Sequence, residues 1–240
     1  PINHPYTPIE SPRVYSVPLK TKVAHITGGL GCPNGCDFCC TSHYFKRRYI
    51  PFIQSGRELY ETMRMMERKA KEVGDCLSGF IFIDEDFFIH EKRAREFLDC
   101  VREGGVSPSI MGFGSVRGLS QFTADEIAEM GFDIIWTAFE GTHSGYKKLR
   151  GAKLDHLYRD LKSRGVSILT SMIIGFPYQD QKKVKAEFKQ LMDLAPDLWQ
   201  ILIYSAFPGT PLHKKVLKEV CYLSAYRDRP DYRKFDGFSM

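Results

Sequence analysis

The sequence contains no apolar run long enough to cross a membrane. A bilayer-spanning helix needs roughly 20 consecutive apolar residues, and no stretch of the 240 residues approaches that length. The N-terminal segment also lacks the apolar block of a secretory signal. With 43% hydrophobic and 26% charged residues, the composition predicts a soluble globular chain with one main core, located in the reducing cytoplasm.

A strong charge of either sign is missing as well. The formal net charge is only +5, and the basic residues form two short runs, Lys46–Arg48 and Lys182–Lys183, rather than a stripe. Short runs of this kind are typical of solvated faces, so nucleic acid is not indicated as a partner.

The cysteine count argues against a disulfide framework, because seven is an odd number and the chain is not short. Three of the seven, Cys32, Cys36 and Cys39, form a C-x-x-x-C-x-x-C loop rich in glycine, with Phe38 before the last cysteine. Three close thiolates can bind three irons of a cubane cluster and leave the fourth iron without a protein ligand. The other cysteines are expected to be small hydrophobic residues rather than ligands.

A zinc knuckle is the alternative use of the same loop. Together with His43, the three cysteines could form a closed Cys₃His site. Zinc modules usually place paired cysteines at two separate points, whereas this chain has one triplet and no second pair. The pattern therefore favours an iron–sulfur cluster over zinc.

Strand-like and helix-like segments alternate along the chain, which predicts a parallel sheet covered by helices. The expected strands are mostly continuous apolar runs, at 23–27, 79–84, 109–115, 133–139, 167–175 and 198–205. The expected helices follow at 57–73, 91–103, 123–130, 154–164, 181–194 and 212–220, and Thr123 with Glu126 has the form of a capping box. Six such units are two short of a closed barrel. The predicted fold is an open, three-quarter (βα)₆ TIM-like barrel.

Ligands of such folds bind at the carboxyl ends of the strands. The connection after the first strand spans about 28 residues, far more than is usual, and is expected to be a structureless functional loop. Asp84, Glu85 and Asp86 end the second strand. Glu85 and Asp86 could instead cap the following helix.

The segment Gly31-Cys32-Pro33-Asn34-Gly35-Cys36-Asp37-Phe38-Cys39 resembles the signature loop of the radical SAM superfamily. The turn Pro208-Gly209-Thr210-Pro211 is similar to one that closes the adenine pocket in many members. The resemblance covers about residues 22–220. It implies a [4Fe-4S] cluster whose free iron chelates S-adenosylmethionine (SAM) and whose electron cleaves it to a 5′-deoxyadenosyl radical.

The resemblance also implies roles for individual residues. Cys32, Cys36 and Cys39 would bind the cluster, and Phe38 would pack against the cofactor. For Arg117, a surface ion pair is an equally open alternative to binding the SAM carboxylate. The complete set expected to hold SAM is Asp84, Glu85, Arg117, Glu140, Ser171, Ile173 and Phe207.

The acidic second-strand motif is most similar to the cobalamin-associated branch, which implies a methyl transfer or a rearrangement. Cobalamin would then bind through a domain absent from this chain, since no cobalamin-binding histidine motif is present. One alternative is a methylthiotransferase, which would require further cluster cysteines upstream. The other is a non-catalytic zinc-knuckle or electron-transfer module. The substrate stays unknown, and the expected electron donor is a flavodoxin or ferredoxin.

The flanks differ from the core in composition. Five prolines in residues 1–21 favour an extended segment or linker. The chain starts with Pro rather than Met, which predicts a core excised from a longer protein. The expected organisation is a linker at 1–21, a radical SAM core at 22–221 and a truncated C-terminal extension at 222–240.

Overall fold

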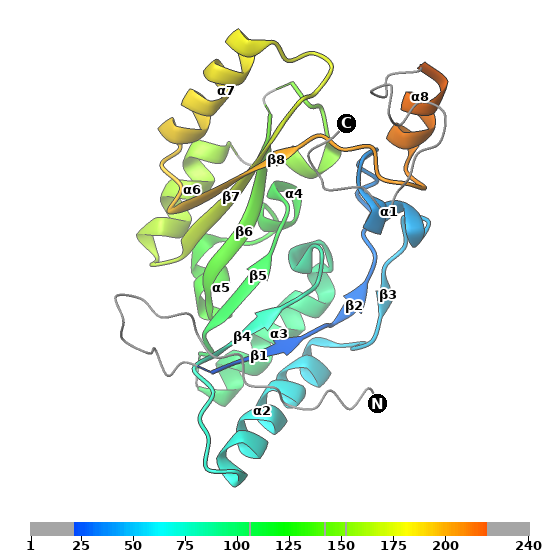
Figure 1. Cartoon of the computed structure of the whole chain (residues 1–240). Coiled ribbons are helices and arrows are strands. Elements are labelled where there is room, and N and C mark those ends of the chain that lie inside the picture. The colour runs from blue at the N-terminus through cyan, green and yellow to red at the C-terminus, as the bar shows by residue number, and fades with distance from the viewer. Residues whose placement is uncertain (1–21, 106, 142, 152, 220–240) are drawn as a thin grey trace.

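A computed structural model of the chain describes residues 22–219 except 106, 142 and 152 (Figure 1). The predicted linker at 1–21 and the predicted extension at 222–240 lie outside the described residues. No helix in the described part of the chain is long and apolar enough to cross a membrane.

Six parallel strands form the main sheet, and their order in space is their order along the chain. They are β1 (Val23–Ile26), β4 (Gly79–Phe82), β5 (Ile110–Phe113), β6 (Phe132–Glu140), β7 (Ser167–Ile174) and β8 (Leu198–Ile203). Within the described residues β1 and β8 each pair on one side only, so the sheet is open. The predicted three-quarter barrel is confirmed, and every predicted strand end lies within two residues of the observed one.

The predicted helices are confirmed to within one residue at each end. They are α2 (Gly56–Glu72), α3 (Glu91–Gly104), α5 (Ala124–Glu129), α6 (Leu154–Ser163), α7 (Gln181–Asp193) and α8 (Pro211–Glu219). Local capping explains where two of them begin: the Ser55 side chain accepts from the Glu58 N–H at the start of α2, and Thr123 and Glu126 form the predicted capping box of α5. Short turns at η1 (Phe87–Ile89), α4 (Val116–Leu119) and η2 (Lys147–Leu149) lie between them.

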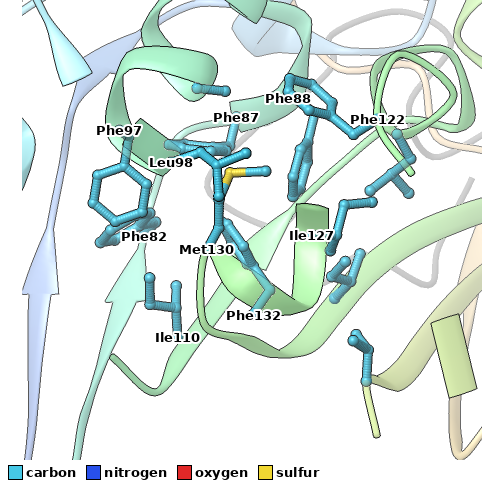
Figure 2. Packing of buried hydrophobic residues seen from close by; sticks show 14 of the residues in the cluster. Phe82, Phe87, Phe88, Phe97, Leu98, Ile110, Phe122, Ile127, Met130 and Phe132 are labelled. Atoms are coloured by element: carbon cyan, nitrogen blue, oxygen red, sulfur yellow. The ribbon is translucent and has the colours of Figure 1, made fainter. Parts of the chain in front are cut away.

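The helix-covered face of the sheet is packed with aromatic rings (Figure 2). Phe82 of β4, Phe87 and Phe132 are at most 1% exposed, and their ring centroids lie 5.2 to 6.0 Å apart. Phe97 of α3 joins them at 5.7 Å from Phe82. Burying each such side chain contributes about 1.5–3 kcal/mol, so this cluster fixes α3 and α5 against the sheet.

The connection between β1 and α2 is not the structureless loop that the sequence predicts. It holds a two-stranded antiparallel ladder, β2 (Gly29–Leu30) with β3 (Ile50–Pro51), and a short helix, α1 (Cys40–Tyr44). Strands of two residues are too short to show an alternating pattern, and so the sequence gives no signal for them. In Figure 1, α1 lies beside α8, although the two are far apart in sequence.

Candidate functional site

The three cysteines of the loop between β2 and α1 line one pocket at the carboxyl end of the sheet. Cys32 and Cys36 are 8% and 5% exposed, Cys39 is half-buried, and all three are free thiols. Phe38 lines the same pocket. The structure thus brings together the four residues that the sequence assigns to the cluster.

Backbone geometry fixes the shape of this loop. Gly31 has φ +93° and Gly35 φ +70°, a region that L side chains rarely adopt. A Cβ on Gly31 would also lie 2.1 Å from the Arg48 carbonyl oxygen. Ser42 then closes the loop from inside, because its hydroxyl donates to the Cys32 carbonyl at 2.9 Å and accepts from the Gly35 N–H at 3.2 Å.

His43, the fourth ligand in the zinc alternative, contacts the backbone of the cysteine loop. The Nε2 atom of His43 lies 3.1 Å from the Cys36 carbonyl oxygen and donates to it, so the imidazole serves the loop backbone. Among the described residues, no three His, Cys, Asp or Glu side chains converge where they could bind one ion.

Burial keeps the thiols protonated in the absence of metal. It raises the pKa of Cys36 to about 12, with nearby Lys148 acting in the opposite direction, and it also raises the pKa of Cys32. Iron binds the thiolate, so loading a cluster must release protons from this pocket.

Asp86 supports the cysteine loop from behind. It is 3% exposed. Its Oδ2 accepts from Asn34 Nδ2 at 3.0 Å, and its Oδ1 accepts from the Ser115 N–H at 3.1 Å. Asn34 Nδ2 also lies 3.3 Å from Cys32 Sγ. Asp86 occupies the N-cap position of η1, but no side-chain hydrogen bond caps η1 or α3, so neither Glu85 nor Asp86 makes the capping hydrogen bond of the alternative reading.

Asp84 belongs to a second buried support. It is 1% exposed, its Oδ1 accepts from Arg93 Nη2 at 2.8 Å, and the Tyr49 hydroxyl donates to the same oxygen. Arg93 also donates to the Tyr49 hydroxyl, which ties α3 to the segment after α1. Asp84 lies outside the pocket lining, whereas Glu85 is exposed and lines the pocket. The chain leaves β4 at Phe82 and turns at Glu85 and Asp86, and Asp86 also lines the pocket.

Glu140 is aimed by a β-bulge. The register between β6 and β7 shifts between Ala138 and Glu140, and Glu140 has φ +61°. Bulges and positive φ at a non-glycine residue concentrate where a side chain must be re-aimed. Glu140 is 3% exposed, its Oε1 pairs with Lys148, and its Oε2 has no partner among the described residues.

Of the two residues of this ion pair, Lys148 lines the pocket, so the ammonium group faces it. Its Nζ lies 5.7 Å from the centroid of the Phe38 ring. Burial is the largest single effect and lowers the pKa of Lys148, but Glu140, Cys36 and Cys39 together outweigh it, so the pKa is raised. A permanent cation therefore stands beside the cysteines. Sequence patterns do not point to Lys148, because the residue follows an irregular loop.

Of the four remaining residues predicted to hold SAM, one lines the pocket and three do not. Ser171 lines the pocket, and its hydroxyl donates to the Thr137 carbonyl at 3.4 Å. Three others do not line the pocket: Ile173 is 2% exposed in β7, Arg117 is exposed on α4, and Phe207 is 36% exposed after β8.

Asp37 joins the cysteine loop to two distant strand ends, and sequence reasoning missed it. Its carboxylate accepts from the Tyr146 hydroxyl at 2.6 Å and from the Tyr204 hydroxyl at 2.9 Å, and its carbonyl accepts from the Leu212 N–H at 3.1 Å. The ring of Phe38 meets both tyrosines edge-on, at 5.4 and 5.8 Å. We refer to Asp37, Tyr146 and Tyr204 as the tyrosine latch.

Solved structures share this architecture. The radical S-adenosylmethionine methyltransferase TsrM from Kitasatospora setae, solved with cobalamin and a [4Fe-4S] cluster bound, aligns with a TM-score of 0.65 at 15% identity, over 85% of this chain and 41% of that one. SuiB from Streptococcus suis, solved with S-adenosylmethionine bound, aligns at 0.52 and 9% identity, over 83% and 47%. This is the fold of a radical SAM core. Methylornithine synthase aligns with the core at 0.50 and 20% identity, over 79% and 56%.

Two curated sequences are similar to the same core. An uncharacterized methyltransferase of Pyrococcus horikoshii is 25% identical over 187 residues, which are 76% of this chain and 39% of that protein. The bacteriochlorophyllide d C-12(1)-methyltransferase of Chlorobaculum tepidum is 21% identical over 215 residues, 87% and 44% respectively. This chain thus spans less than half the length of both relatives. No protein-family model matches the chain.

Proposed function

We propose that this chain is the catalytic core of a radical SAM enzyme that carries out methyl transfer. The observation that carries the proposal is the convergence of Cys32, Cys36 and Cys39 on one pocket at the carboxyl end of an open (βα)₆ barrel. Both similar curated proteins are named methyltransferases, as is TsrM, and these names favour methyl transfer over rearrangement.

Each pocket group has a task in this proposal. The three thiolates would hold a [4Fe-4S] cluster, which when bound supplies the electron that cleaves the sulfonium bond of SAM. Glu85 would accept from the SAM amino group, and Lys148 would bind its carboxylate, because each faces the pocket with the complementary charge. The Ser171 hydroxyl would bind the ribose hydroxyls, and Phe38 would pack against the cofactor. Glu140 does not line the pocket, and it would act by holding Lys148, with which its Oε1 pairs.

The proposal also includes a second cofactor, cobalamin. TsrM was solved with cobalamin, and we extend cobalamin use to the whole protein, through a domain outside this chain. A methylthiotransferase is the second candidate within the enzymes. An electron-transfer module is the candidate from another class, and it requires a fourth protein ligand to the cluster.

Reduction of the cluster needs an external electron donor, for which we propose an acidic flavodoxin or ferredoxin. The exposed run Lys46–Arg48 follows the cysteine loop directly. Lys46 and Arg47 have φ of +53° and +58°, and the guanidinium of Arg47 lies against Gly35. These cations would meet an acidic carrier on the outer side of the loop.

Anaerobic reconstitution followed by electron paramagnetic resonance tests the proposal. The reduced protein is expected to show a cubane signal that changes when SAM is added, because SAM would occupy the open iron. Cys36→Ala should abolish the signal. Cys76→Ala is the matched control, since Cys76 is exposed and outside the pocket. A signal that SAM leaves unchanged would point to a cluster with four protein ligands, and a colourless protein that retains zinc would refute the proposal.

A further inference from the structure

The inner face of the barrel, which points away from the helices, continues from the cysteine pocket as two rows of apolar side chains. The strand register places Ile81, Met111 and Ile134 side by side in one row. The second row consists of Phe113, Trp136, Leu169 and Leu198. Each row crosses several strands, so the face is apolar as a continuous surface and not at isolated positions.

This surface is open, unlike the helix-covered face. Ile110, Ile135 and Ile168 on the covered face are at most 1% exposed. Their neighbours in sequence on the inner face, Met111, Trp136 and Leu169, are only half-buried. Ile83, Leu198 and Leu202 are 41%, 57% and 39% exposed. A contiguous apolar surface of this kind marks a binding site.

The chemistry of the inner face changes with depth. Ala138, Ser171 and Gln200 are paired across β6, β7 and β8 and lie nearest the cysteines. The charged pocket groups Glu85 and Lys148 lie beyond the strand ends. His25 and Ser167 continue the first row at its two ends. Between them neither row contains Asp, Glu, Lys or Arg, so a ligand charge placed there would lose its hydration without gaining a charged partner.

An aromatic pair joins the rows to the cofactor pocket. The rings of Phe113 and Trp136 are stacked, with centroids 5.2 Å apart and an interplanar angle of 29°, and both line the cysteine pocket. Flat rings gain most from such a stack, because further aromatic groups prefer offset contacts at similar distances. An extended peptide would fit poorly, since the apolar rows offer its backbone no hydrogen-bond partners.

We infer that the inner face binds a flat, uncharged aromatic or conjugated ring system of the substrate against Phe113 and Trp136. The inference rests on the proposed function, because a substrate at this stack would lie beside SAM in the shared pocket. The inference adds a substrate class to the proposed function. The ring-bearing part of the substrate enters the barrel, and any charged group of the same substrate stays at the polar mouth.

The two tryptophans of the chain permit a direct test. Trp199 packs on Phe188 of α7, at 5.5 Å, and a Trp199→Phe variant leaves Trp136 as the one indole. Labelled with 5-fluorotryptophan, this variant gives one ¹⁹F resonance from the inner face. Three probes of similar width are titrated: 2-naphthol, which is flat and neutral; decahydro-2-naphthol, which is neutral but not flat; and naphthalene-2,6-disulfonate, which is flat but charged at both ends, so that one charge must enter the apolar rows.

2-Naphthol is expected to shift the resonance saturably and to bind about tenfold more tightly than either other probe. Phe113→Leu, which keeps an apolar side chain at this position, should weaken 2-naphthol binding by a similar factor. Phe188→Leu on the opposite face is the matched control and should leave binding unchanged. Equal affinity for all three probes, no shift with any probe, or unchanged binding in Phe113→Leu would overturn the inference. The titration needs neither cluster nor SAM, so its failure is distinguishable from failure of the proposed function.

Discussion

The two faces of the same six strands are built differently. Phe82 on the helix-covered face is fully buried, whereas Ile83, the next residue, is 41% exposed on the inner face. Ile135 and Trp136 show the same contrast in β6, two strands further along the sheet. Residues that are neighbours in sequence and similar in hydrophobicity therefore have different roles on the two faces. One face holds the fold together by packing, and the other leaves apolar surface free for a ligand.

The largest expected effect comes from breaking the packed face. Phe82→Ala removes a ring that contacts Phe87, Phe97 and Phe132 and should lower the free energy of unfolding by about 3–5 kcal/mol. Ile83→Ala on the open face should cost less than about 1 kcal/mol, because the side chain is already half in water. Urea denaturation of both variants measures the contrast. Equal losses would show that the inner face is packed in solution.

A smaller effect is expected from the polar support behind the acidic run. Arg93→Met leaves Asp84 as a buried, unpaired carboxylate and should cost about 3 kcal/mol. Glu85→Gln changes the pocket-facing carboxylate and should leave stability within about 0.5 kcal/mol. Denaturation midpoints measure both. The double variant Arg93→Met/Asp84→Leu should regain part of the loss, and a double variant as unstable as the single one would contradict the role given to the pair.

The smallest expected effect concerns the tyrosine latch. Tyr146→Phe removes one hydrogen bond to Asp37 and should cost about 1 kcal/mol. It should also speed loss of the cluster after reconstitution, because Asp37 lies between the ligand Cys36 and Phe38. Tyr178→Phe is the control, since its hydroxyl donates to Glu187 at 3.2 Å, away from the loop. Iron release to a chelator, timed for both variants, measures the difference. Equal release rates would show that the latch does not hold the loop.

Sequence patterns predicted the elements better than the contacts between them. The six strands were predictable because each is an apolar run bounded by loops, and the cysteine loop because its ligands are close in sequence. The placement of Asp84 outside the pocket and of Glu85 and Asp86 in its lining was not predictable, since it depends on contacts with Arg93, Asn34 and the Ser115 backbone. Lys148 was missed for the same reason, because only the fold brings it to the cysteines.

The tyrosine latch has a consequence for the order in which the protein matures. Its two hydrogen bonds join residues 109 and 167 positions apart in the sequence. Contacts of such separation form late, because the chain between them must first be ordered. During synthesis the cysteines emerge early, but Tyr204 leaves the ribosome only after all six strands. The cysteine loop therefore reaches its final shape after the barrel is complete, and we expect the finished core, rather than the nascent chain, to receive the proposed cluster.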